Sequence, residues 1–385
     1  MKSKNTTSPI QEVRSPRKKM KDAAFARLWA KAAGRCEFCN RIVYEDSETT
    51  EDNNNAQIAH IVAFSENGPR GDEELSKLLD GHDENVMLLC AEHHHLIDHE
   101  GKENYSVEFL QQMKHDHEER VRLVTELKDD RKTECLSYTA VIGDKMPTVS
   151  DADIRNALWH NRRYPKSRQA LRIMGNNGVK DWDPDYWSSE EKRLVNEFNR
   201  LVDNGSESEG VHYSIFALAP QPLLVKLGAL LGSLRKFDVY QRNRDTQSWA
   251  WQDEGSTSFI FDRPECADGK AVFILALSAT AIINQVKNQL KDSENSFWVL
   301  SADNPGYNCI TNKEQLAVFR SKVEDVLDDI RSRSKASEIH VFMAVPCSCA
   351  VEFGRAWMSK ADLPLVLYNL NPEENKYINV LTIKA

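Results

Sequence analysis

The sequence predicts two domains of different class, an α+β domain at the N-terminus and an α/β domain at the C-terminus. Three observations lead to this prediction. The chain has 385 residues, a length typical of two domains. Eight of its 11 histidines and three of its eight cysteines fall between positions 36 and 117. After about position 210, apolar strand-like runs alternate with helix-like segments instead.

The composition is that of a globular protein, with 41% hydrophobic and 28% charged residues. The longest mostly apolar stretch, 271–283, is too short to span a bilayer. The first residues are polar and basic, unlike a secretory signal. We therefore expect a cytosolic protein with no membrane partner, in which the eight cysteines are thiols or metal ligands and not disulfides.

Charge is unevenly distributed along the chain, although the net charge of -9 at first argues against a nucleic-acid partner. Residues 1–21 contain seven Lys or Arg and one Glu, whereas residues 22–128 contain 11 basic and 23 acidic residues. A basic arm on an acidic body is able to follow DNA phosphates. A solvated tail without that role is the alternative.

These patterns predict three segments: an N-terminal domain with its basic arm at 1–128, a polar connector at 129–164, and a larger C-terminal domain at 165–385. In the first domain, spacing and turn residues predict helices at 22–33, 91–98 and 106–127 and strands at 57–62 and 86–89. We expect Phe25, Leu28 and Trp29 to share one face of the first helix. Phe109, Leu110 and Met113 should face inward from the last.

Two short pairs of metal-ligand residue types lie far apart in this domain. Cys36 and Cys39 form a Cys-x-x-Cys pair, and Cys90 and His93 form a Cys-x-x-His pair. Zinc takes four nitrogen or sulfur ligands in a tetrahedron, and two such pairs supply them. The spacing therefore predicts a structural zinc site, with two unrelated pairs of buried thiols as the alternative.

Three further residues complete a pattern around these pairs. His60 lies on a predicted strand, Asn85 precedes a Leu-Leu-Cys run, and His94 directly follows the second pair. In this combination, residues 30–128 resemble the HNH endonuclease family, whose ββα-metal fold carries a zinc knuckle in many members. The resemblance implies a metal-dependent nuclease that hydrolyses phosphodiester bonds in double-stranded DNA.

Phosphodiester hydrolysis needs an activated water and a divalent cation that stabilises the transition state. His60 is expected to act as the general base, because a histidine accepts a proton near neutral pH. The resemblance implies that Asn85 holds the ββα loop. His94 and Asp98, four residues apart on one helix face, are expected to hold Mg²⁺ or Mn²⁺.

One position departs from the family pattern. Many HNH members place a metal-binding residue directly before the base, whereas this chain has Ala59 there. The catalytic cation must then depend on His94, Asp98 and the DNA phosphate. His95 and His99 form a competing pair with the same spacing. We expect His115 and His117 to have surface or structural roles.

The C-terminal region alternates strands and helices. It has predicted strands at 212–218, 271–277, 339–345 and 364–370, and predicted helices at 223–234, 281–290 and 353–358. Buried strands followed by Pro-bearing or small-residue turns and helices predict an open parallel sheet. Ligands of such sheets bind at the carboxyl ends of the strands, where helix N-termini offer amide donors to anions. The region has no Gly-x-Gly-x-x-Gly or Walker loop, so neither a redox dinucleotide nor ATP is supported.

The order of several segments, at 216–228, 239–251, 275–280 and 340–355, is similar to that of the SAVED domain. That family fuses two CARF-like, Rossmann-type halves and senses cyclic oligonucleotides. The resemblance covers about 165–385. We expect the ligand to contact residues near strand ends and in the 240–251 segment: Gln221, Tyr240, Arg242, Arg244, Trp251, Ser278, Thr280, Pro346, Cys347 and Ser348.

These side chains suit a cyclic di- or trinucleotide, because arginines pair with phosphates or stack on bases and aromatic rings stack on bases. Core packing is the alternative for Trp249 and Trp251, and a solvated hairpin for Arg242 and Arg244. Cys347 and Cys349 lack the spacing of a metal site.

An HNH nuclease joined to a SAVED sensor resembles effectors of cyclic-oligonucleotide antiphage signalling (CBASS). The resemblance implies that ligand binding drives assembly into a dimer or tetramer in which the nuclease domains cut DNA. Two alternatives stay open: a ligand-gated DNA-binding regulator without cleavage, and a constitutive restriction-type HNH nuclease.

Overall fold

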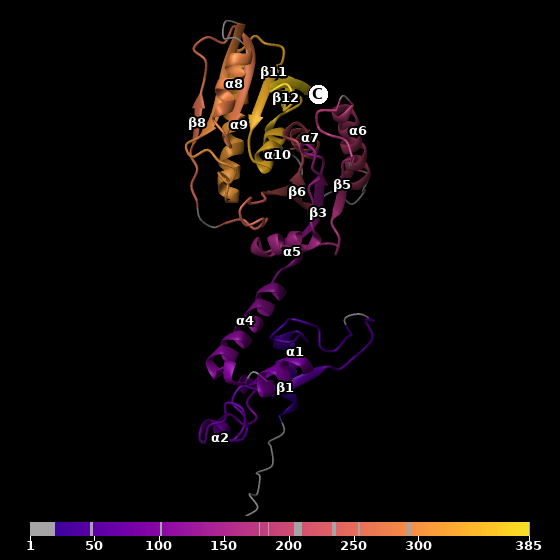
Figure 1. Ribbon diagram of the computed structural model, residues 1–385, viewed down its shortest axis with the longest axis vertical. Coiled ribbons are helices and arrows are strands. Elements are labelled where there is room, and N and C mark those ends of the chain that lie inside the picture. The colour runs from indigo at the N-terminus through magenta and orange to yellow at the C-terminus, as the bar shows by residue number, and fades with distance from the viewer. Residues whose placement is uncertain are drawn as a thin grey trace, which may run out of the picture. The chain divides into compact units, whose positions relative to one another are not determined.

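The computed structural model describes residues 20–46, 49–100, 102–176, 178–183, 185–203, 210–232, 236–252, 255–290 and 294–384. The chain divides into two compact units, Met1–Leu127 and Lys128–Ala385 (Figure 1). The basic arm expected at the N-terminus lies outside the described residues up to position 19.

Unit 1 is an α+β unit built around a two-stranded antiparallel sheet. Its elements are α1 (Asp22–Ala32), β1 (Ala56–His60), α2 (Leu75–Leu79), η1 (Asp83–Asn85), β2 (Val86–Cys90), α3 (Ala91–His95), η2 (Leu96–Glu100), η3 (Lys102–Asn104) and α4 (Val107–Thr125). β1 pairs with β2 so that Ala56 lies opposite Cys90 and His60 opposite Val86. η2 is a π-helix that directly continues α3. The strands and helices lie within a few residues of the predicted positions.

The core of unit 1 lies against β2, all five residues of which are buried. Leu28 and Ala32 of α1 and Leu110 of α4 pack onto it. Phe109, expected to face inward, is 50% exposed, and Phe25, expected on one face with Leu28 and Trp29, is 45% exposed. Each helix contacts the small core along a narrow stripe of residues three or four apart, which leaves the flanking aromatic rings outside.

Unit 2 contains two sheets. The five-stranded sheet has the order β4-β3-β6-β7, with β5 also pairing with β3, and all its pairs are parallel. Its strands are β3 (Lys132–Thr139), β4 (Tyr164–Pro165), β5 (Leu171–Met174), β6 (His212–Leu218) and β7 (Lys236–Tyr240). The segment expected to be a connector, 129–164, thus supplies β3, a central strand with seven of its eight residues buried. The sequence did not predict this strand, because polar residues alternate with apolar ones along it.

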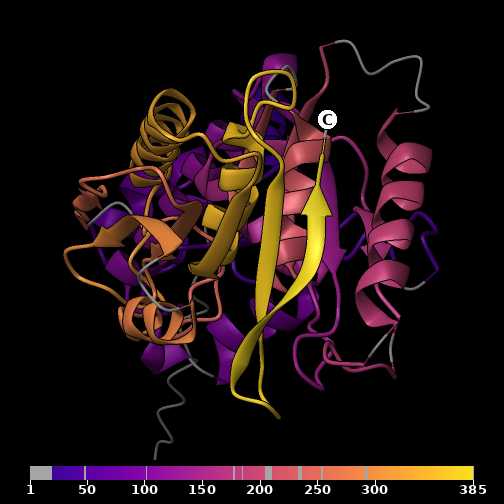
Figure 2. The same ribbon diagram turned by 90° about the horizontal axis from the view of Figure 1, so that it is seen from above.

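The second sheet has six strands in the order β13-β12-β11-β9-β10-β8. They are β8 (Phe259–Asp262), β9 (Lys270–Ala276), β10 (Asn295–Ala302), β11 (Ile339–Ala344), β12 (Leu365–Asn371) and β13 (Lys376–Ile383). The four inner strands are parallel, and both edge strands pair antiparallel to their neighbours. The hairpin of β12 and β13 is the yellow pair in Figure 2. The predicted α/β architecture with parallel sheets is confirmed.

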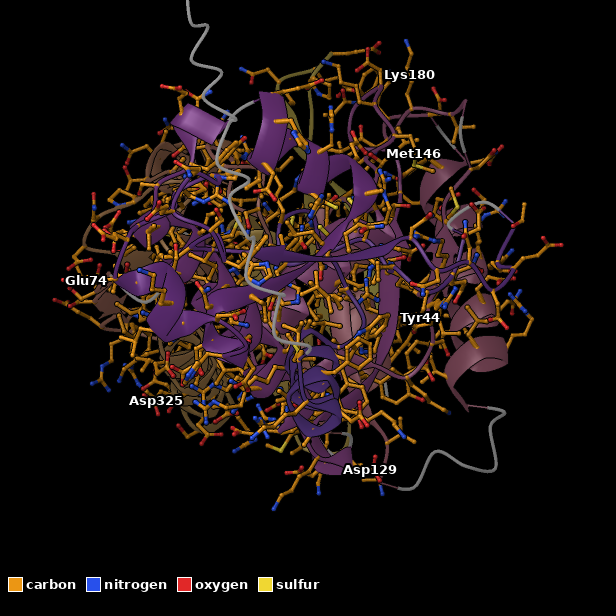
Figure 3. All side chains as sticks on the ribbon, turned by 90° about the horizontal axis from the view of Figure 1, so that it is seen from below. Tyr44, Glu74, Asp129, Met146, Lys180 and Asp325 are labelled. Atoms are coloured by element: carbon orange, nitrogen blue, oxygen red, sulfur yellow. The ribbon has the colours of Figure 1, made fainter. Side chains whose placement is uncertain are left out.

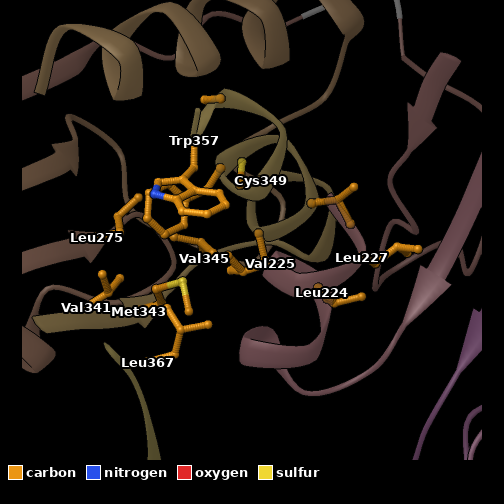
Figure 4. Close-up of a cluster of buried hydrophobic side chains, with 14 of the residues drawn as sticks. Leu224, Val225, Leu227, Leu275, Val341, Met343, Val345, Cys349, Trp357 and Leu367 are labelled. Atoms are coloured by element: carbon orange, nitrogen blue, oxygen red, sulfur yellow. The ribbon is translucent and has the colours of Figure 1, made fainter. Parts of the chain in front are cut away.

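The helices of unit 2 are α5 (Asp151–His160), α6 (Tyr186–Phe198), α7 (Gln221–Leu231), α8 (Ala281–Leu290), α9 (Lys313–Arg333) and α10 (Cys347–Ala356), with short helical turns η4 (Asp129–Arg131) and η5 (Asn199–Asp203). α7 and α10 pack side by side between the two sheets (Figure 1). One continuous core joins these helices to the inner faces of both sheets. Figure 4 shows part of this core. Val225 of α7 lies near Val345, which follows β11, and near Cys349 of α10.

The opposite faces of the two sheets have smaller cores of their own. α5 covers the outer face of the five-stranded sheet, and α8 covers that of the six-stranded sheet. Charged side chains such as Glu74 and Asp325 are exposed and project outward from the ribbon (Figure 3). In the described part of the chain, no helix combines the length and apolar character needed to cross a membrane.

Candidate metal centre and ligand cavity

Cys36, Cys39, Cys90 and His93 converge in unit 1, with one ligand atom of each within 4.8 Å of the others. The Sγ of Cys90 lies 3.0 Å from Nδ1 of His93 and that of Cys36 lies 4.0 Å from it. Ligands of a tetrahedral zinc stand roughly 3.5–4 Å apart. The cluster is therefore close to the geometry of a structural zinc site.

The local fold explains how the two pairs meet. The chain reverses at Asn40, which has a left-handed backbone (φ 61), so that the amide of Cys36 donates to the carbonyl of Arg41 at 2.8 Å. The amide of Glu37 donates to the carbonyl of Leu88 at 2.8 Å, which ties the turn to β2. β2 ends at Cys90, and one turn of α3 brings His93 back over it.

The chemistry of the donors fits zinc. Burial raises the pKa of the Cys36 thiol, so in the absence of a cation this group stays protonated. A zinc ion supplies the positive charge that a buried thiolate requires. The ring of Phe38 stacks on His93 with centroids 4.3 Å apart, which fixes the orientation of the imidazole. Among the described residues, these four form the only group of three or more potential metal ligands.

Beside this cluster lie the residues expected to carry catalysis. His60 is the last residue of β1, and its side chain is half-buried. Asn85 is buried and bonds to one residue through both ends of its amide: Oδ1 accepts from the Val62 amide and Nδ2 donates to the Val62 carbonyl, both at 2.9 Å. The backbone of Asn85 also accepts from Ile61 at 2.8 Å. These bonds fix the chain directly after His60.

α3 packs against β1 and β2 and carries His94, and η2, which continues it, carries Asp98, the two candidate ligands of a second cation. Nε2 of His94 lies 3.6 Å from Oδ2 of Asp98, a separation at which both atoms are able to contact one ion. Arg70, which the sequence analysis did not identify, donates to Oδ1 of Asp98 at 2.7 Å. Ala59 is buried, 2% exposed, and so contributes nothing to this side of the strand.

The other histidines lie elsewhere. His95 and His99 have rings 4.9 Å apart, and Nε2 of His95 lies 3.5 Å from Glu100 on the exposed side of the helix. His117 is buried and lies 3.1 Å from the carbonyl of Ala32, a structural contact between α4 and α1. His115 is exposed.

Unit 2 contains a cavity of about 310 Å³ at the carboxyl ends of its strands. It is bordered by residues that follow β6, β7, β9, β10 and β11 and by parts of β12 and β13. Its wall includes Gln221 and Cys347, the first residues of α7 and α10. Two helix N-termini thus border one cavity, an arrangement that favours an anion.

Five of the ten predicted ligand-binding residues line this cavity: Gln221, Arg244, Ser278, Pro346 and Cys347. Nε2 of Gln221 donates to the carbonyl of Val345 at 3.1 Å. Its Oε1 is buried and has no hydrogen-bond partner among the described residues, so it is an acceptor available to a ligand. Burial raises the pKa of the Cys347 thiol to about 11, so this side chain is neutral at pH 7.

The other five predicted residues do not line the cavity. Tyr240 is 1% exposed and its ring stacks on Phe216 at 4.4 Å, so no face is open to a base. Ser348 is buried in the first turn of α10. Trp251 packs against the core, Arg242 bonds to the carbonyl of Gln247 within its own loop, and Thr280 is exposed before α8.

The cavity is also lined by residues that none of the sequence motifs described above indicates. The guanidinium of Arg244 lies 3.6 Å from the ring centroid of Tyr307, in the turn after β10. The amide of Arg244 donates to Asn308 at 3.1 Å, so the loops after β7 and β10 are joined. The Asp-Asn-Pro-Gly run before Tyr307, directly after an apolar strand, was an available signal. Gln241, Tyr368, Asn369 and Tyr377 also line the cavity.

Comparisons with known proteins identify part of the chain. Residues 194–383 match the model of the SAVED family, described as "SMODS-associated and fused to various effectors sensor domain". No curated protein matches the chain significantly. The matched range begins within α6, so β3, β4, β5 and α5 precede it.

Several solved structures are similar to the chain. One is the Acinetobacter baumannii Cap4 SAVED/CARF-domain containing receptor with the cyclic trinucleotide 2'3'3'-cAAA, at 15% identity over 82% of this chain and 71% of that chain, with a TM-score of 0.42. The same receptor with 3'3'3'-cAAA matches at 16% identity over 82% and 72%, with a TM-score of 0.42. The Moraxella osloensis Cap4 receptor matches at 13% identity over 82% and 70%, with a TM-score of 0.39. From the family match, residues 194–383 are a SAVED sensor domain.

Proposed function

We propose that the protein is a metal-dependent endonuclease of double-stranded DNA that a cyclic oligonucleotide activates through the SAVED domain. In this proposal it acts as a CBASS antiphage effector. The observation that supports the nuclease half is that His60 (β1), Asn85 (η1), His94 (α3) and Asp98 (η2) lie on the consecutive elements that also carry Cys90 and His93 of the Cys₃His cluster. The SAVED domain and its cavity carry the sensor half.

In the proposed reaction His60 accepts the proton of the attacking water, the role for which histidine is the most common side chain. Asn85 acts indirectly, since its two bonds to Val62 fix the backbone that follows the base. A bound Mg²⁺ or Mn²⁺ supplies stabilisation of the charge on the phosphate and leaving oxygen.

His94 and Asp98 are the residues that would hold this cation. Mg²⁺ commonly takes one or two protein ligands and fills its remaining positions with waters and substrate phosphate oxygens. The buried Ala59 does not add a third ligand. With two protein ligands, the proposed cation would complete its coordination with waters and, when DNA is bound, with phosphate oxygens.

The sensor half follows from the cavity. Its Arg244 side chain is suited to a phosphate, and the N-termini of α7 and α10 add amide dipoles of the same sign. Tyr307 and Tyr368 offer aromatic surface for bases, and Gln221 and Asn369 offer amide groups for base edges or ribose hydroxyls. A cyclic di- or trinucleotide presents all three kinds of group.

We further propose that the ligand activates the enzyme by driving self-association, with a dimer or tetramer as the active form. A ligand shifts an assembly equilibrium only by binding the assembled state more tightly. The acidic composition of residues 22–128 disfavours DNA binding by one copy. Several basic arms in one assembly would offset this through multivalency.

The test is a plasmid-degradation assay with purified full-length protein, Mg²⁺ and a panel of cyclic di- and trinucleotides. We expect cleavage only with a matching ligand, and none with His60→Ala. His115→Ala, an exposed histidine of α4, is the matched control and should cut normally. Cleavage at specific sequences without any nucleotide would favour the restriction-type alternative. Ligand-dependent DNA binding by wild-type protein without cleavage would favour the regulator.

A further inference from the structure

Arg70 is a buried arginine in the loop between β1 and α2, with its side chain 7% exposed. Its guanidinium donates four hydrogen bonds, to the carbonyl oxygens of Ile61 (2.7 Å), Ile97 (3.1 Å) and His60 (3.1 Å) and to Oδ1 of Asp98 (2.7 Å). An arginine has five N–H donors, so nearly all its hydrogen-bonding capacity is used on two segments of unit 1, the end of β1 and η2.

The loop is built to deliver this side chain. Arg70 adopts a left-handed backbone with φ 54, which is uncommon outside glycine. A β-carbon on Gly71 would lie 2.4 Å from the carbonyl oxygen of Ser65, and one on Gly68 would lie 2.5 Å from Cβ of Ala63. The turn therefore closes tightly on both sides of Arg70, a strained arrangement of the kind that clusters at functional sites.

The four acceptors belong to the two segments that carry the proposed chemistry. The carbonyls of His60 and Ile61 mark the end of β1, where the proposed base lies. Ile97 and Asp98 belong to η2, which carries a proposed ligand of the cation. The planar fork of the guanidinium holds these segments at a fixed separation.

We propose that Arg70 is a positioning residue of the nuclease reaction, which sets His60 relative to the cation held by His94 and Asp98. This inference rests on the proposed function. Arg70 does not touch DNA or the reacting atoms in this role. Its charge also bears on Asp98, since the guanidinium takes Oδ1 and leaves Oδ2 on the side of His94.

The two carboxylate oxygens of Asp98 thus face different partners, Arg70 and His94. This difference makes it possible to distinguish a positioning role of Arg70 from simple structural support. His94 and Asp98 lie on one continuous helical segment, so their spacing does not need Arg70. A positive guanidinium beside the carboxylate opposes a divalent cation. Loss of Arg70 should therefore leave Mn²⁺ affinity equal or higher while slowing cleavage.

Two variants test the inference. Arg70→Gly suits the left-handed backbone and removes the whole side chain. Arg70→Lys keeps one positive charge but loses the planar fork. Arg27→Lys is the matched control, because Arg27 is 57% exposed in the same unit and forms its ion pair with Asp83, away from β1 and η2. Zinc content and the thermal unfolding temperature show which variants are folded.

For Arg70→Lys we expect full zinc content, wild-type DNA affinity in Ca²⁺, and a kcat for plasmid cleavage lowered by about 100-fold, the scale of a 1 Å misplacement. For Arg70→Gly, Mn²⁺ binding followed by electron paramagnetic resonance should be at least as tight as in wild type, whereas Asp98→Asn should weaken it. Guanidinium chloride at tens of millimolar, compared with equal NaCl, should restore part of the Arg70→Gly rate.

Three results would overturn the inference while leaving the nuclease proposal intact: wild-type kcat in a folded Arg70→Lys, a loss of Mn²⁺ affinity in Arg70→Gly that parallels the loss of kcat, or loss of zinc and fold in both variants. If wild-type protein cuts no DNA with any nucleotide, the proposed function fails first and the inference fails with it.

Discussion

Gly228 of α7 and Gly354 of α10 face each other where the two helices cross. A β-carbon added to Gly228 would lie 2.0 Å from the carbonyl oxygen of Val351 and 3.0 Å from Cα of Gly354. One added to Gly354 would lie 2.0 Å from the carbonyl oxygen of Val225. The contact is reciprocal, and it joins the helix that follows β6 to the helix that follows β11.

Because backbone lies on both sides of this contact, neither glycine accepts a methyl group without separating the helices. We expect Gly228→Ala or Gly354→Ala to lower the unfolding free energy of unit 2 by about 2–4 kcal/mol, as overpacking of a core does at its upper end. Nucleotide affinity should also fall, since α7 and α10 border the cavity.

Urea denaturation measures the first effect and calorimetry the second. Gly306→Ala is the control, because the space around Gly306 is open and its backbone is not left-handed. Wild-type stability in either crossing variant would contradict the packing argument.

The Cys₃His cluster predicts one zinc ion per chain with a structural role. Cys90→Ser should lose the ion and unfold unit 1, because the removed thiol is one of four ligands and is buried at the end of β2. Atomic emission of purified protein measures the zinc, and circular dichroism the helix content. Cys266→Ser, an exposed cysteine of unit 2, should keep both. A Cys90→Ser protein with full zinc content would remove Cys90 from the ligand set.

We expect the substitution Asn85→Ala to lower both the stability of unit 1 and its nuclease activity. Replacing Asn85 by alanine leaves the amide and carbonyl of Val62 unpaired in a buried place, at a cost of about 1–3 kcal/mol for each group. The unfolding temperature of unit 1 should fall, and plasmid cleavage should fall with it because the chain after His60 is released. The exposed Asn53→Ala is the control. Full cleavage by a folded Asn85→Ala protein would argue against its role beside the base.

The stack of Arg244 on Tyr307 predicts two separable contributions to nucleotide binding. Arg244→Ala should weaken binding by about 10–100-fold, since it removes a charge-assisted bond of roughly 1.5–3 kcal/mol to a phosphate. Tyr307→Phe keeps the ring and should bind nearly normally, whereas Tyr307→Leu should not. Calorimetry with the activating nucleotide measures all three. Arg263→Ala, whose guanidinium lies 5.9 Å from the Phe261 ring outside the cavity, is the control.

Asp238 of β7 predicts a pH-dependent contribution to stability. Burial alone would raise its pKa, but His212 at 3.5 Å and Lys313 at 2.9 Å outweigh burial and hold the pKa of Asp238 well below its ordinary value. A carboxylate with a lowered folded pKa stabilises the fold above its unfolded pKa, and this stabilisation is lost as pH falls through the folded pKa.

Asp238→Asn should therefore lower the unfolding free energy by about 2–4 kcal/mol near pH 6, because Lys313 and Arg163, 2.9 Å and 3.1 Å from its carboxylate, lose their counter-charge. The difference from wild type should shrink as pH falls below about 4. Urea denaturation between pH 6 and pH 3.5 follows this change. Asp268→Asn, at an exposed pair with Lys335, should show no such trend. A difference that is constant with pH would show that Asp238 acts by packing and not by charge.

Much of this fold is predictable from the sequence, because strongly apolar strands and capped helices are recognisable from the local pattern of residues. β9 and β11 and the helix that Ser106 caps fall within a residue or two of their expected bounds. β3 was missed since its polar residues, among them Glu134 and Ser137, are paired inside the sheet and not exposed at its surface.

The candidate sites were predictable where spacing alone defines them. Cys36, Cys39, Cys90 and His93 carry ligand spacing in the sequence itself. Arg70 and Tyr307 do not, because their roles depend on loops that fold back across other elements. Tyr240 shows the converse: its position after a strand suggested a ligand contact, but the ring is used to pack on Phe216.

The neighbouring histidines of α3 place a constraint on how that helix is rotated. His93 joins the cysteine cluster, while His94 lies beside Asp98. Successive residues of a helix point about 100° apart, so the rotation that turns His93 toward the cysteines also fixes the directions of His94 and Asp98. The run of three histidines, 93–95, offers a one-residue slip in which His94 would meet the cysteines, and the pair His95 and His99 would take the place of the pair His94 and Asp98. A zinc ion bound through His93 would thus do more than stabilise unit 1: it would select the rotation of α3 in which His94 and Asp98, and not His95 and His99, occupy the proposed cation site.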